Sequence, residues 1–304
     1  MQPIISDEAI KTRENWVEKI KVLSGNFSGD TKKMEEELAA EIKIKGPSTL
    51  IDHLRLCGNI PESYKHDSSE EKLYSKYTDN LLSFAYQQMG LKSIVLTERS
   101  DAADVEAVAK SYSFVADAKA FRVSRSAKNQ KDFKIEALDG WKQGKDYAMV
   151  VGPIYQFPTR SSQIYQQSSR RNVCIFTYSH LSLLVNYALK EGSLKSETLL
   201  HEIFKTVEAL NPGKISQDYW ASVNQTMLKF SEVIRELWTI EKKAASESTK
   251  LAKEEGLNFL AAEREKIMGM SHDEALQELI KVSKLESKLY IINSIRDSQL
   301  FDIQ

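Results

Sequence analysis

One short segment, SYSFVADAKAFRV (111–123), constrains the fold of this chain more than any other part of its sequence. Its composition is typical of a strand, and side chains in a strand alternate between two faces. Asp117 and Lys119, two residues apart, therefore share one face with Val115. The pattern predicts a strand over 113–122 that carries a carboxylate and an ammonium side by side.

A second acidic residue lies in the preceding segment, DAADVEAVAK (101–110), which also has the pattern of a strand. Lys110 and Ser111 would form the turn of a hairpin between the two segments. Asp104 and Asp117 are equally far from this turn, so the pairing places them opposite each other. Opposite residues of paired strands have Cβ atoms ~4.5–5.5 Å apart, close enough for two carboxylates to bind one divalent cation. Because such a site offers only oxygen ligands, Mg²⁺ is the expected ion.

Two carboxylates and an ammonium in this arrangement suit the hydrolysis of a phosphodiester. A cation held by Asp104 and Asp117 would bind a phosphate oxygen and a water, and would lower the pKa of that water. Lys119 would orient the water or stabilise the negative charge that develops. The alternative is an ordinary exposed ion pair on a strand, which contributes only ~0–1 kcal/mol to stability.

The residues that follow Lys119 are strongly basic. Between 119 and 134 the sequence KAFRVSRSAKNQKDFK holds six lysines and arginines and one acid, although the net charge of the whole chain is −1. Lysine and arginine bind phosphates and amide side chains read base edges, so the run suits DNA. The alternative is a solvated helix face, the usual place for a run of charges. Its position directly after the candidate strand favours DNA.

Individual residues of this run are candidates for contacts with DNA. Asn129 and Gln130 each carry an amide that could pair with adenine, and Arg125 or Lys128 could pair with guanine. Each of them could instead bind phosphate or water. The candidate DNA-binding residues are Arg125, Lys128, Asn129, Gln130 and Lys131, with Arg160 as a further candidate in a later loop.

The stretch VADAKAFRVSRSAKNQKDFK (115–134) closely resembles the corresponding part of the HindIII type II restriction endonuclease family, within the PD-(D/E)XK nuclease superfamily. The resemblance extends over about 49–182. Its shorter matches are GNIPES (58–63), EEKLYSKYTDNLL (70–82), DYAMVVGPIYQFPT (146–159), SQI (162–164) and QQS (166–168). The D-x-K pattern alone is weak, whereas the twenty-residue match is specific.

The resemblance implies a role for each residue of the candidate site. Asp104 matches the first metal-binding carboxylate of the family, Asp117 the second, and Lys119 the catalytic lysine. The backbone carbonyl of Ala118 is a further expected ligand of the metal. The hairpin before Asp117 is about two residues shorter here, and an even-numbered deletion keeps each side chain on its face.

Glu71 is a candidate supporting acid, because it lies on the helix before the metal strands, where relatives often place one. Ser68 and Glu71 also fit a capping box, which would give Glu71 a role in starting that helix. Both interpretations stay open at this point.

As a whole, the resemblance implies a Mg²⁺-dependent restriction endonuclease that cuts double-stranded DNA. The expected site is the palindrome AAGCTT, cut after the first adenine to leave 5′ phosphates and four-base 5′ overhangs. A symmetric double-strand break implies a homodimer. The host then requires a companion DNA methyltransferase, with which no direct contact is expected. The alternatives are a superfamily nuclease of repair or junction resolution, and a DNA-binding module whose metal site has decayed.

The rest of the sequence excludes several other classes of site. MQPIISDEAI at the start lacks a signal-peptide pattern, and no apolar run approaches the ~18 residues of a membrane span, so we expect a cytoplasmic protein with no membrane partner. Cys57 and Cys174 match no zinc or redox spacing, and the five histidines form no metal-binding pair. No Walker loop, nucleophile elbow or dinucleotide fingerprint is present.

Periodicity along the chain predicts an α/β fold with a mixed β-sheet nuclease core of αβα type and extensive additional N- and C-terminal helices. Helices are expected over 69–89 and 126–141 and from Ser179 to a stop at Gly192. Strands are expected near 93–97, 103–109, 113–122, 147–151 and 173–178.

Three regions follow from this pattern: an N-terminal helical region (1–48), the nuclease core (49–195) and a C-terminal helical subdomain (196–304). The last region reads as nearly unbroken helix over 216–269, with a further helix from 271 to 289 that starts with a capping box. Such helices could cradle DNA, form a dimer seam or support the core, and support of the core is the simplest interpretation.

Overall fold

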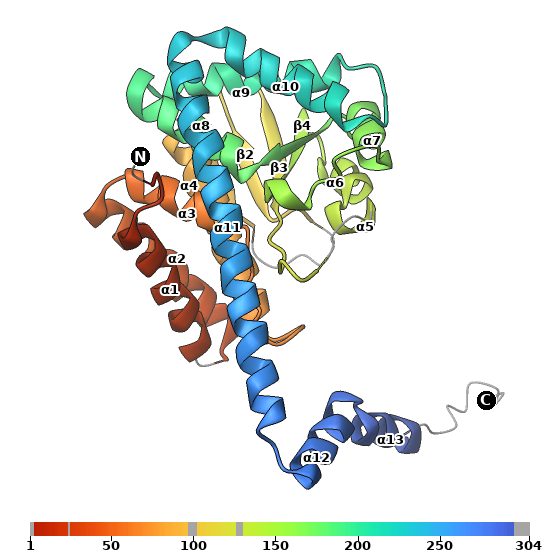
Figure 1. Cartoon of the computed structure of the whole chain (residues 1–304). Coiled ribbons are helices and arrows are strands. Elements are labelled where there is room, and N and C mark those ends of the chain that lie inside the picture. The colour runs from red at the N-terminus through yellow and green to blue at the C-terminus, as the bar shows by residue number, and fades with distance from the viewer. Residues whose placement is uncertain (1–2, 24, 97–101, 126–129, 295–304) are drawn as a thin grey trace, which may run out of the picture. The chain divides into compact units, whose positions relative to one another are not determined.

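A computed structural model describes residues 3–23, 25–96, 102–125 and 130–294 of the chain. It has a five-stranded sheet flanked by helices, which confirms the predicted α/β class with additional terminal helices (Figure 1). The strands are β1 (Lys92–Val95), β2 (Val105–Val108), β3 (Ser113–Ala118), β4 (Tyr147–Gly152) and β5 (Val173–Thr177). The helices are α1 (Asp7–Val22), α2 (Phe27–Lys45), α3 (Ser48–Leu56), α4 (Ser69–Gln88), α5 (Gln130–Phe133), α6 (Ile135–Trp141), the 3₁₀ turn η1 (Ile154–Gln156), α7 (Gln163–Arg171), α8 (Tyr178–Glu191), α9 (Ser193–Glu208), α10 (Ser216–Phe230), α11 (Glu232–Met268), α12 (His272–Val282) and α13 (Leu285–Ser294).

The sheet is mixed and runs in the order β1-β2-β3-β4-β5. β1, β2 and β3 pair antiparallel, whereas β3, β4 and β5 pair parallel. Every residue of β4 and β5 is buried. Unbroken apolar runs are typical of parallel strands, because helices cover both faces of such a sheet. The two runs that were predicted as strands therefore occupy the interior.

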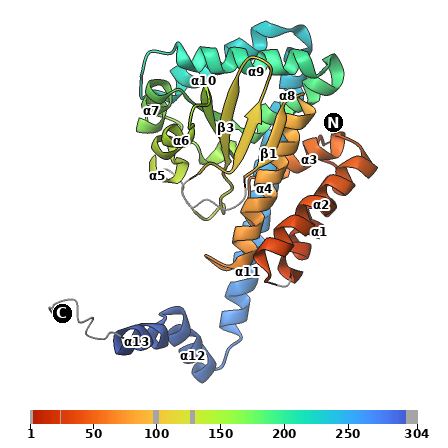
Figure 2. The same cartoon turned by 180° about the vertical axis from the view of Figure 1, so that it is seen from behind.

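Helices lie against both faces of the sheet, as the two opposite views show (Figures 1 and 2). α4 packs along β1, β2 and β3 and also contacts α8. The ring of Tyr86 in α4 meets Phe114 of β3 edge to face at 4.9 Å, and Phe204 of α9 lies at the same centroid distance from Phe114. Aromatic pairs of this kind contribute ~0.5–1.5 kcal/mol beyond their burial. They fix α4 and α9 to the central strand.

The third strand is shorter than predicted, since β3 ends at Ala118 and not near 122. Phe121 leaves the sheet and pairs with an earlier segment of the chain. Its N–H donates to the Gly58 carbonyl at 3.1 Å, and its carbonyl accepts from the Ile60 N–H at 3.3 Å. This contact joins residues about sixty positions apart, so alternation along the strand did not reveal it. β1 begins one residue earlier than predicted and ends at Val95, and β2 is three residues shorter than predicted. Residue 97 lies outside the described residues.

The helix predicted over 126–141 is divided into α5 and α6. Lys134 separates the two, because its φ of +48° is left-handed and interrupts the helical hydrogen bonds. The predicted start at Ser126 lies outside the described residues. The repeat of apolar residues every four positions continues through this break, which is why the pattern predicted one helix.

Two C-terminal helices also end earlier than predicted. The helix expected over 216–269 breaks at Ser231, whose extended backbone (φ −162°) separates α10 from α11. The helix expected over 271–289 begins with the predicted capping box at Ser271 but ends at Val282. Apolar periodicity marks which face is buried and is weak at placing single-residue breaks of this kind.

By its internal contacts the chain forms two compact units, Met1–Gly256 and Leu257–Gln304. The first unit contains the whole sheet and α1 to α10, and α11 runs from the first unit into the second. In the second unit, neither α12 nor α13 has a buried residue. Among the described helices of both units, none combines the length and apolar character needed to cross a membrane.

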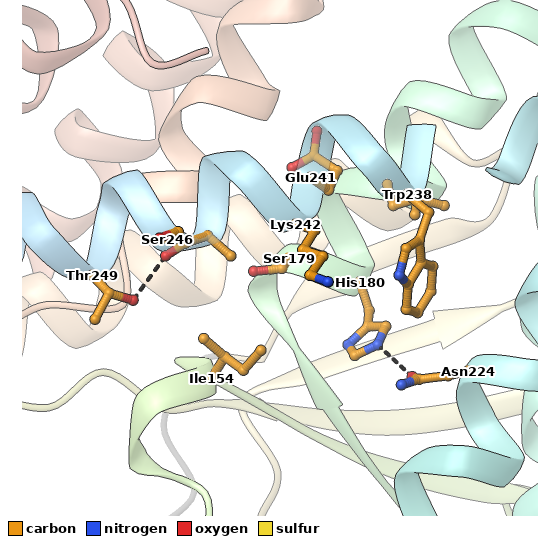
Figure 3. A pocket seen from close by; sticks show the side chains of 11 residues that line it. Ile154, Ser179, His180, Asn224, Trp238, Glu241, Lys242, Ser246 and Thr249 are labelled. Carbon is orange, nitrogen blue, oxygen red and sulfur yellow. Dashed lines mark hydrogen bonds between the residues drawn. The ribbon is translucent and has the colours of Figure 1, made fainter. Parts of the chain in front are cut away.

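A hollow of about 320 Å³ lies in the first unit, lined by residues of α8, α10 and α11 (Figure 3). His180 lines it, and both ring nitrogens have partners: Nδ1 lies 2.6 Å from Oγ1 of Thr177, and Nε2 lies 3.0 Å from Oδ1 of Asn224. The ring also stacks on Trp220 at 5.5 Å. Burial lowers the pKa of His180 to about 4, so the ring is neutral near pH 7. His180 therefore joins α8 to α10 as a structural group.

The burial of Leu81 on α4 gives a test of this packing. Leu81→Ala should lower the free energy of unfolding by ~2–5 kcal/mol, because it leaves a cavity in a fully buried position. The same change at Leu194, which is 64% exposed, should alter it by less than ~0.5 kcal/mol. Urea unfolding of both variants measures the difference. Equal effects at the two positions would contradict the described position of α4.

Candidate active site

The pairing of β2 with β3 brings the two predicted carboxylates together. Val105 lies opposite Ala116, so the next position outward pairs Asp104 with Asp117. Asp104 directly precedes β2, and its carbonyl accepts a hydrogen bond from the Leu96 N–H at 2.8 Å, which continues the ladder with β1. The hairpin therefore has the register that equal spacing from Lys110-Ser111 predicted.

Lys119 lies beside Asp117, with 2.5 Å between Nζ and Oδ2. The Asp117 side chain is 1% exposed and that of Lys119 13%, so the ion pair is buried. The Lys119 N–H donates to the Val151 carbonyl at 2.7 Å, which holds this residue at the edge of the sheet. Ala118, the expected backbone ligand, is the last residue of β3 and lies between the two. The structure thus brings together the four residues predicted to form the site, which are Asp104, Asp117, Ala118 and Lys119.

Helix α4 adds two charged residues that sequence reasoning missed. Nζ of Lys76 lies 3.0 Å from Oδ2 of Asp79 and 3.2 Å from Oδ1 of Asp104. The Asp79 side chain is only 2% exposed. The available signal was an acid between Tyr77 and Leu81, two residues of the apolar stripe of this helix. A charge so close to a buried stripe needs a partner, and the structure supplies Lys76.

Burial and proximity shift the pKa values of the two carboxyls in opposite directions. Burial, reinforced by the negative charge of Asp104, outweighs Lys119 and raises the pKa of Asp117 to about 6. Burial acts on Asp104 as well, but the neighbouring Asp117 carboxyl and the charges of Lys76 and Lys119 outweigh it and lower its pKa. One buried site thus holds two carboxyls that compete for ionisation. A divalent cation would relieve that competition.

The oxygens of Asp117 fit a metal ion. Both are buried: Oδ2 pairs with the Lys119 ammonium, whereas Oδ1 has no hydrogen-bond partner among the described residues, and Oδ1 of Asp79 is in the same state. A buried carboxylate oxygen without a donor is unfavourable unless a cation compensates it. Carboxylate and carbonyl oxygens are the ligands that Mg²⁺ prefers.

Sequence comparisons point to the same chemistry. A sequence model of the HindIII restriction endonuclease family matches residues 14–296 of this chain. The chain belongs to the HindIII restriction endonuclease family. It is 34% identical over 298 residues to the type II restriction enzyme HindIII of Haemophilus influenzae, an alignment that covers 93% of this chain and 95% of that enzyme. Family membership makes this chain a type II restriction endonuclease, a site-specific deoxyribonuclease.

Glu71 of this HindIII-family chain has both carboxylate oxygens engaged. Oε1 accepts from Nη1 of Arg122 at 3.0 Å, and Oε2 accepts from the backbone N–H of Asp67 at 2.7 Å. Ser68 caps α4 by accepting from the Glu71 N–H, but the Glu71 carboxylate turns to Asp67, so the predicted capping box is half formed. His66, Asp67 and Glu71 place ligand atoms within 4.8 Å of one another at this exposed helix start. An exposed acidic cluster alone does not indicate a metal.

The segment that follows Lys119 is anchored on one side by residues 62–71. Besides its pair with Glu71, Arg122 donates from Nη2 to the Tyr64 carbonyl at 2.9 Å. The N–H and hydroxyl of Ser124 donate to the two carboxylate oxygens of Glu62 at 2.9 and 2.7 Å. Arg122, a member of the basic run, is therefore occupied inside the protein and does not face solvent as a free cation.

Two further elements hold the same segment. Nε2 of Gln156 donates to the carbonyls of Arg122 and Arg125 at 3.3 and 3.0 Å. On α11, Gly256 permits a close approach, because a Cβ there would lie 2.7 Å from Cγ2 of Val123. Together with residues 62–71, these contacts define what we call the anchored segment, 122–125.

Arg125 and Lys131 are exposed candidates for DNA contacts. The Arg125 side chain is 52% exposed and pairs with Oδ1 of Asp132 at 3.0 Å. An exposed ion pair of this kind is weak, so a DNA phosphate can compete for the guanidinium. Both residues flank the part of the basic run that lies outside the described residues.

The other candidates are less constrained by the structure. Gln130 is the first residue of α5. Lys128 and Asn129 lie outside the described residues. Arg160 is exposed, and its backbone is fixed because its carbonyl accepts from the Ser216 N–H at 2.8 Å.

The first site prediction concerns the three central side chains. Asp104→Asn, Asp117→Asn and Lys119→Ala should each lower the cleavage rate by at least ~10²-fold, the scale of losing one electrostatic stabiliser. Binding of duplex DNA should persist, because the exposed cations are unchanged. Cleavage assays in Mg²⁺ and binding assays without it measure both quantities, with the exposed Lys110→Ala as control. Near-parental cleavage by Lys119→Ala would refute the assignment.

The second site prediction concerns the ion pair of Glu71 with Arg122, whose side chains are 17% and 11% exposed. Glu71→Gln and Arg122→Met each leave one partner of the pair unsatisfied, so each should lower the free energy of unfolding by ~1–3 kcal/mol. The double variant should be about as stable as either single one. The Mg²⁺ concentration for half-maximal cleavage should stay unchanged in Glu71→Gln and in Arg122→Met.

Chemical denaturation and Mg²⁺ titrations test this expectation. A supporting acid at the metal would behave differently: Glu71→Gln alone would shift the Mg²⁺ dependence, and Arg122→Met would not.

Proposed function

We propose that this restriction endonuclease cuts both strands of double-stranded DNA at AAGCTT in a Mg²⁺-dependent reaction. Cleavage after the first adenine leaves 5′ phosphates and four-base 5′ overhangs. The proposal is supported above all by the convergence of Asp104, Asp117 and Lys119 at one edge of the sheet. The 34% identity to the type II restriction enzyme HindIII supports it further.

In the proposed mechanism, Asp104 and Asp117 hold the cation, with the Ala118 carbonyl as a further ligand. When bound, Mg²⁺ neutralises charge on the scissile phosphate and lowers the pKa of a water. Lys119, fixed by Asp117 and by its backbone bond to β4, orients the attacking water and stabilises the negative charge that develops. Lys76 keeps the Asp104 carboxylate in position through its 3.2 Å contact.

Recognition is assigned to the basic run that follows the anchored segment. Arg125, Lys128 and Lys131 provide charge for phosphates or guanine, and Asn129 and Gln130 provide amides for adenine. Because the anchored segment begins three residues after Lys119, base recognition and chemistry occupy one short stretch of chain. Retention of Asp104, Asp117 and Lys119 together argues against a DNA-binding module whose metal site has decayed.

The biological setting follows from the same proposal. One centre per chain cuts one strand, so a symmetric break at a palindrome requires a homodimer. The enzyme works in the cytoplasm, where its DNA is, and the host DNA is protected by a companion methyltransferase that modifies the same site. A methyl group on N6 of the first adenine removes a donor hydrogen and crowds the contact.

End-sequencing of digested genomic DNA tests the site directly. We expect every end to derive from AAGCTT, and N6-methylated sites to resist. Asn129→Ala should cost ~1–3 kcal/mol of discrimination if Asn129 reads a base, but should weaken binding to all sequences equally if it holds phosphate. A different hexamer, or random ends, would contradict the assigned specificity and leave the metal site intact.

A further inference from the structure

The anchored segment is supported from α11 by two adjacent residues, Glu255 and Gly256. Both lie in the first unit, which ends at Gly256. Gly256 is buried inside the helix, and the Glu255 side chain is 34% exposed. Neither residue is part of the candidate active site. Their contacts lead instead to residues 121–125, which connect Lys119 to the candidate DNA-binding residues.

The Glu255 carboxylate holds Asn59 by two routes. Oε2 of Glu255 accepts from Nδ2 of Asn59 at 3.1 Å and lies 2.8 Å from Nη1 of Arg13. Arg13 in turn donates from Nη2 to the Asn59 carbonyl at 3.0 Å. Asn59 is buried, and the Arg13 side chain is 12% exposed. Loss of the carboxylate would therefore leave both donors without this acceptor inside the protein, which is unfavourable.

Asn59 connects Glu255 to Phe121, because the two residues form a parallel bridge outside the main sheet. The ring of Phe121 lies under the guanidinium of Arg125, whose Cζ is 5.8 Å from the ring centroid. A cation is attracted to the face of an aromatic ring, so the position of the ring influences that of the guanidinium. Glu255 thus acts on Arg125, the exposed candidate for a DNA contact, through Asn59 and Phe121.

Gly256 supports the same segment by having no side chain. A Cβ at Gly256 would lie 2.7 Å from Cγ2 of Val123, closer than two carbon atoms approach without displacement. Val123 is β-branched, so its side chain has little freedom to turn away. Glycine is unfavourable inside a helix, and the close approach of Val123 gives a reason for glycine here. A larger residue at this position would displace Val123 within the anchored segment.

We propose that Glu255 and Gly256 are positioning residues for sequence discrimination. Together they fix the course of residues 121–125, so that Arg125 and Lys119 keep a set spacing when both meet DNA. The inference rests on the proposed function, in which Arg125 contacts the DNA and Lys119 acts at the scissile phosphate. A residue that only stabilises the fold changes how much enzyme is active, whereas a positioning residue changes the ratio of cleavage at correct and incorrect sites.

Cleavage of two duplexes measures this ratio. One duplex contains the hexamer at which the parent cuts genomic DNA, and the other differs from it by one base pair. Gly256→Ala should lower the ratio of the two kcat/KM values by about 10-fold, a part of the discrimination that one mismatched base pair commonly provides. The matched control is Gly140→Ala on α6, where an added Cβ meets nothing in the described structure within 4 Å. The control should keep the parent ratio.

A double variant tests whether the effect passes through Val123. Val123→Ala removes Cγ2, the atom that the added methyl group would meet. Gly256→Ala combined with Val123→Ala should therefore recover most of the parent ratio, because the two changes are coupled through one contact. Both duplexes are cut by the same preparation, so a smaller fraction of folded enzyme cancels in the ratio.

Glu255→Ala provides an independent variant. It should lower the ratio in the same direction, because it removes the acceptor of Asn59 and Arg13. Glu254→Ala is its control: this neighbouring side chain is 54% exposed and pairs only at 3.6 Å with the exposed Lys250. An exposed pair of this kind contributes little, so the control should keep the parent ratio.

A parent ratio in both Gly256→Ala and Glu255→Ala, or a double variant without recovery, would overturn the inference and leave the proposed function standing. The parent reports separately on the proposed function. A parent that cuts at another hexamer contradicts the assigned site, and the ratios are then compared at that hexamer. A parent that cuts without preference contradicts the proposed recognition itself, and this inference with it.

Discussion

The buried Asp117 carboxylate, opposite Asp104 and in contact with Lys119, is the interaction on which the site and much of the fold depend. A carboxylate at 1% exposure is unstable without compensation. The structure compensates it through elements that are distant in sequence: the β2–β3 hairpin, the parallel strand β4 that fixes Lys119, and α4, whose Lys76 joins Asp104 to Asp79. The sheet and α4 thus supply, from three separate parts of the sequence, the partners that this buried charge cluster requires.

Local sequence patterns were sufficient to predict the β2–β3 hairpin and the proximity of Asp104, Asp117 and Lys119. Equal spacing from a turn predicts the opposition of Asp104 and Asp117, since pairing in a hairpin is set by counting. The end of β3 was not predictable in this way, because it depends on Phe121 pairing with a segment some sixty residues earlier. Lys76 was missed for the same reason, since only the packing of α4 on the sheet brings it to Asp104.

The basic run illustrates a second limit of sequence reasoning. By composition alone, Arg122 and Arg125 are equivalent cations three residues apart. In the structure Arg122 is 11% exposed and bound to Glu71 and the Tyr64 carbonyl, whereas Arg125 is 52% exposed. The sequence alone does not distinguish an arginine that forms internal contacts from an arginine that is exposed to solvent. Their difference comes from tertiary neighbours.

In the proposed function, the anchored segment connects the residues proposed to read DNA to the residues proposed to cut it. Gln156, Glu62 and Gly256 constrain residues 122–125, which begin three positions after Lys119, the proposed catalytic lysine. If the basic run reads DNA as proposed, a substitution that moves residues 122–125 also acts close to Lys119 in the chain. On that proposal, a change of specificity and a change of cleavage rate are expected to accompany each other. Such a coupling would protect a host genome, because relaxed recognition would come with impaired cutting.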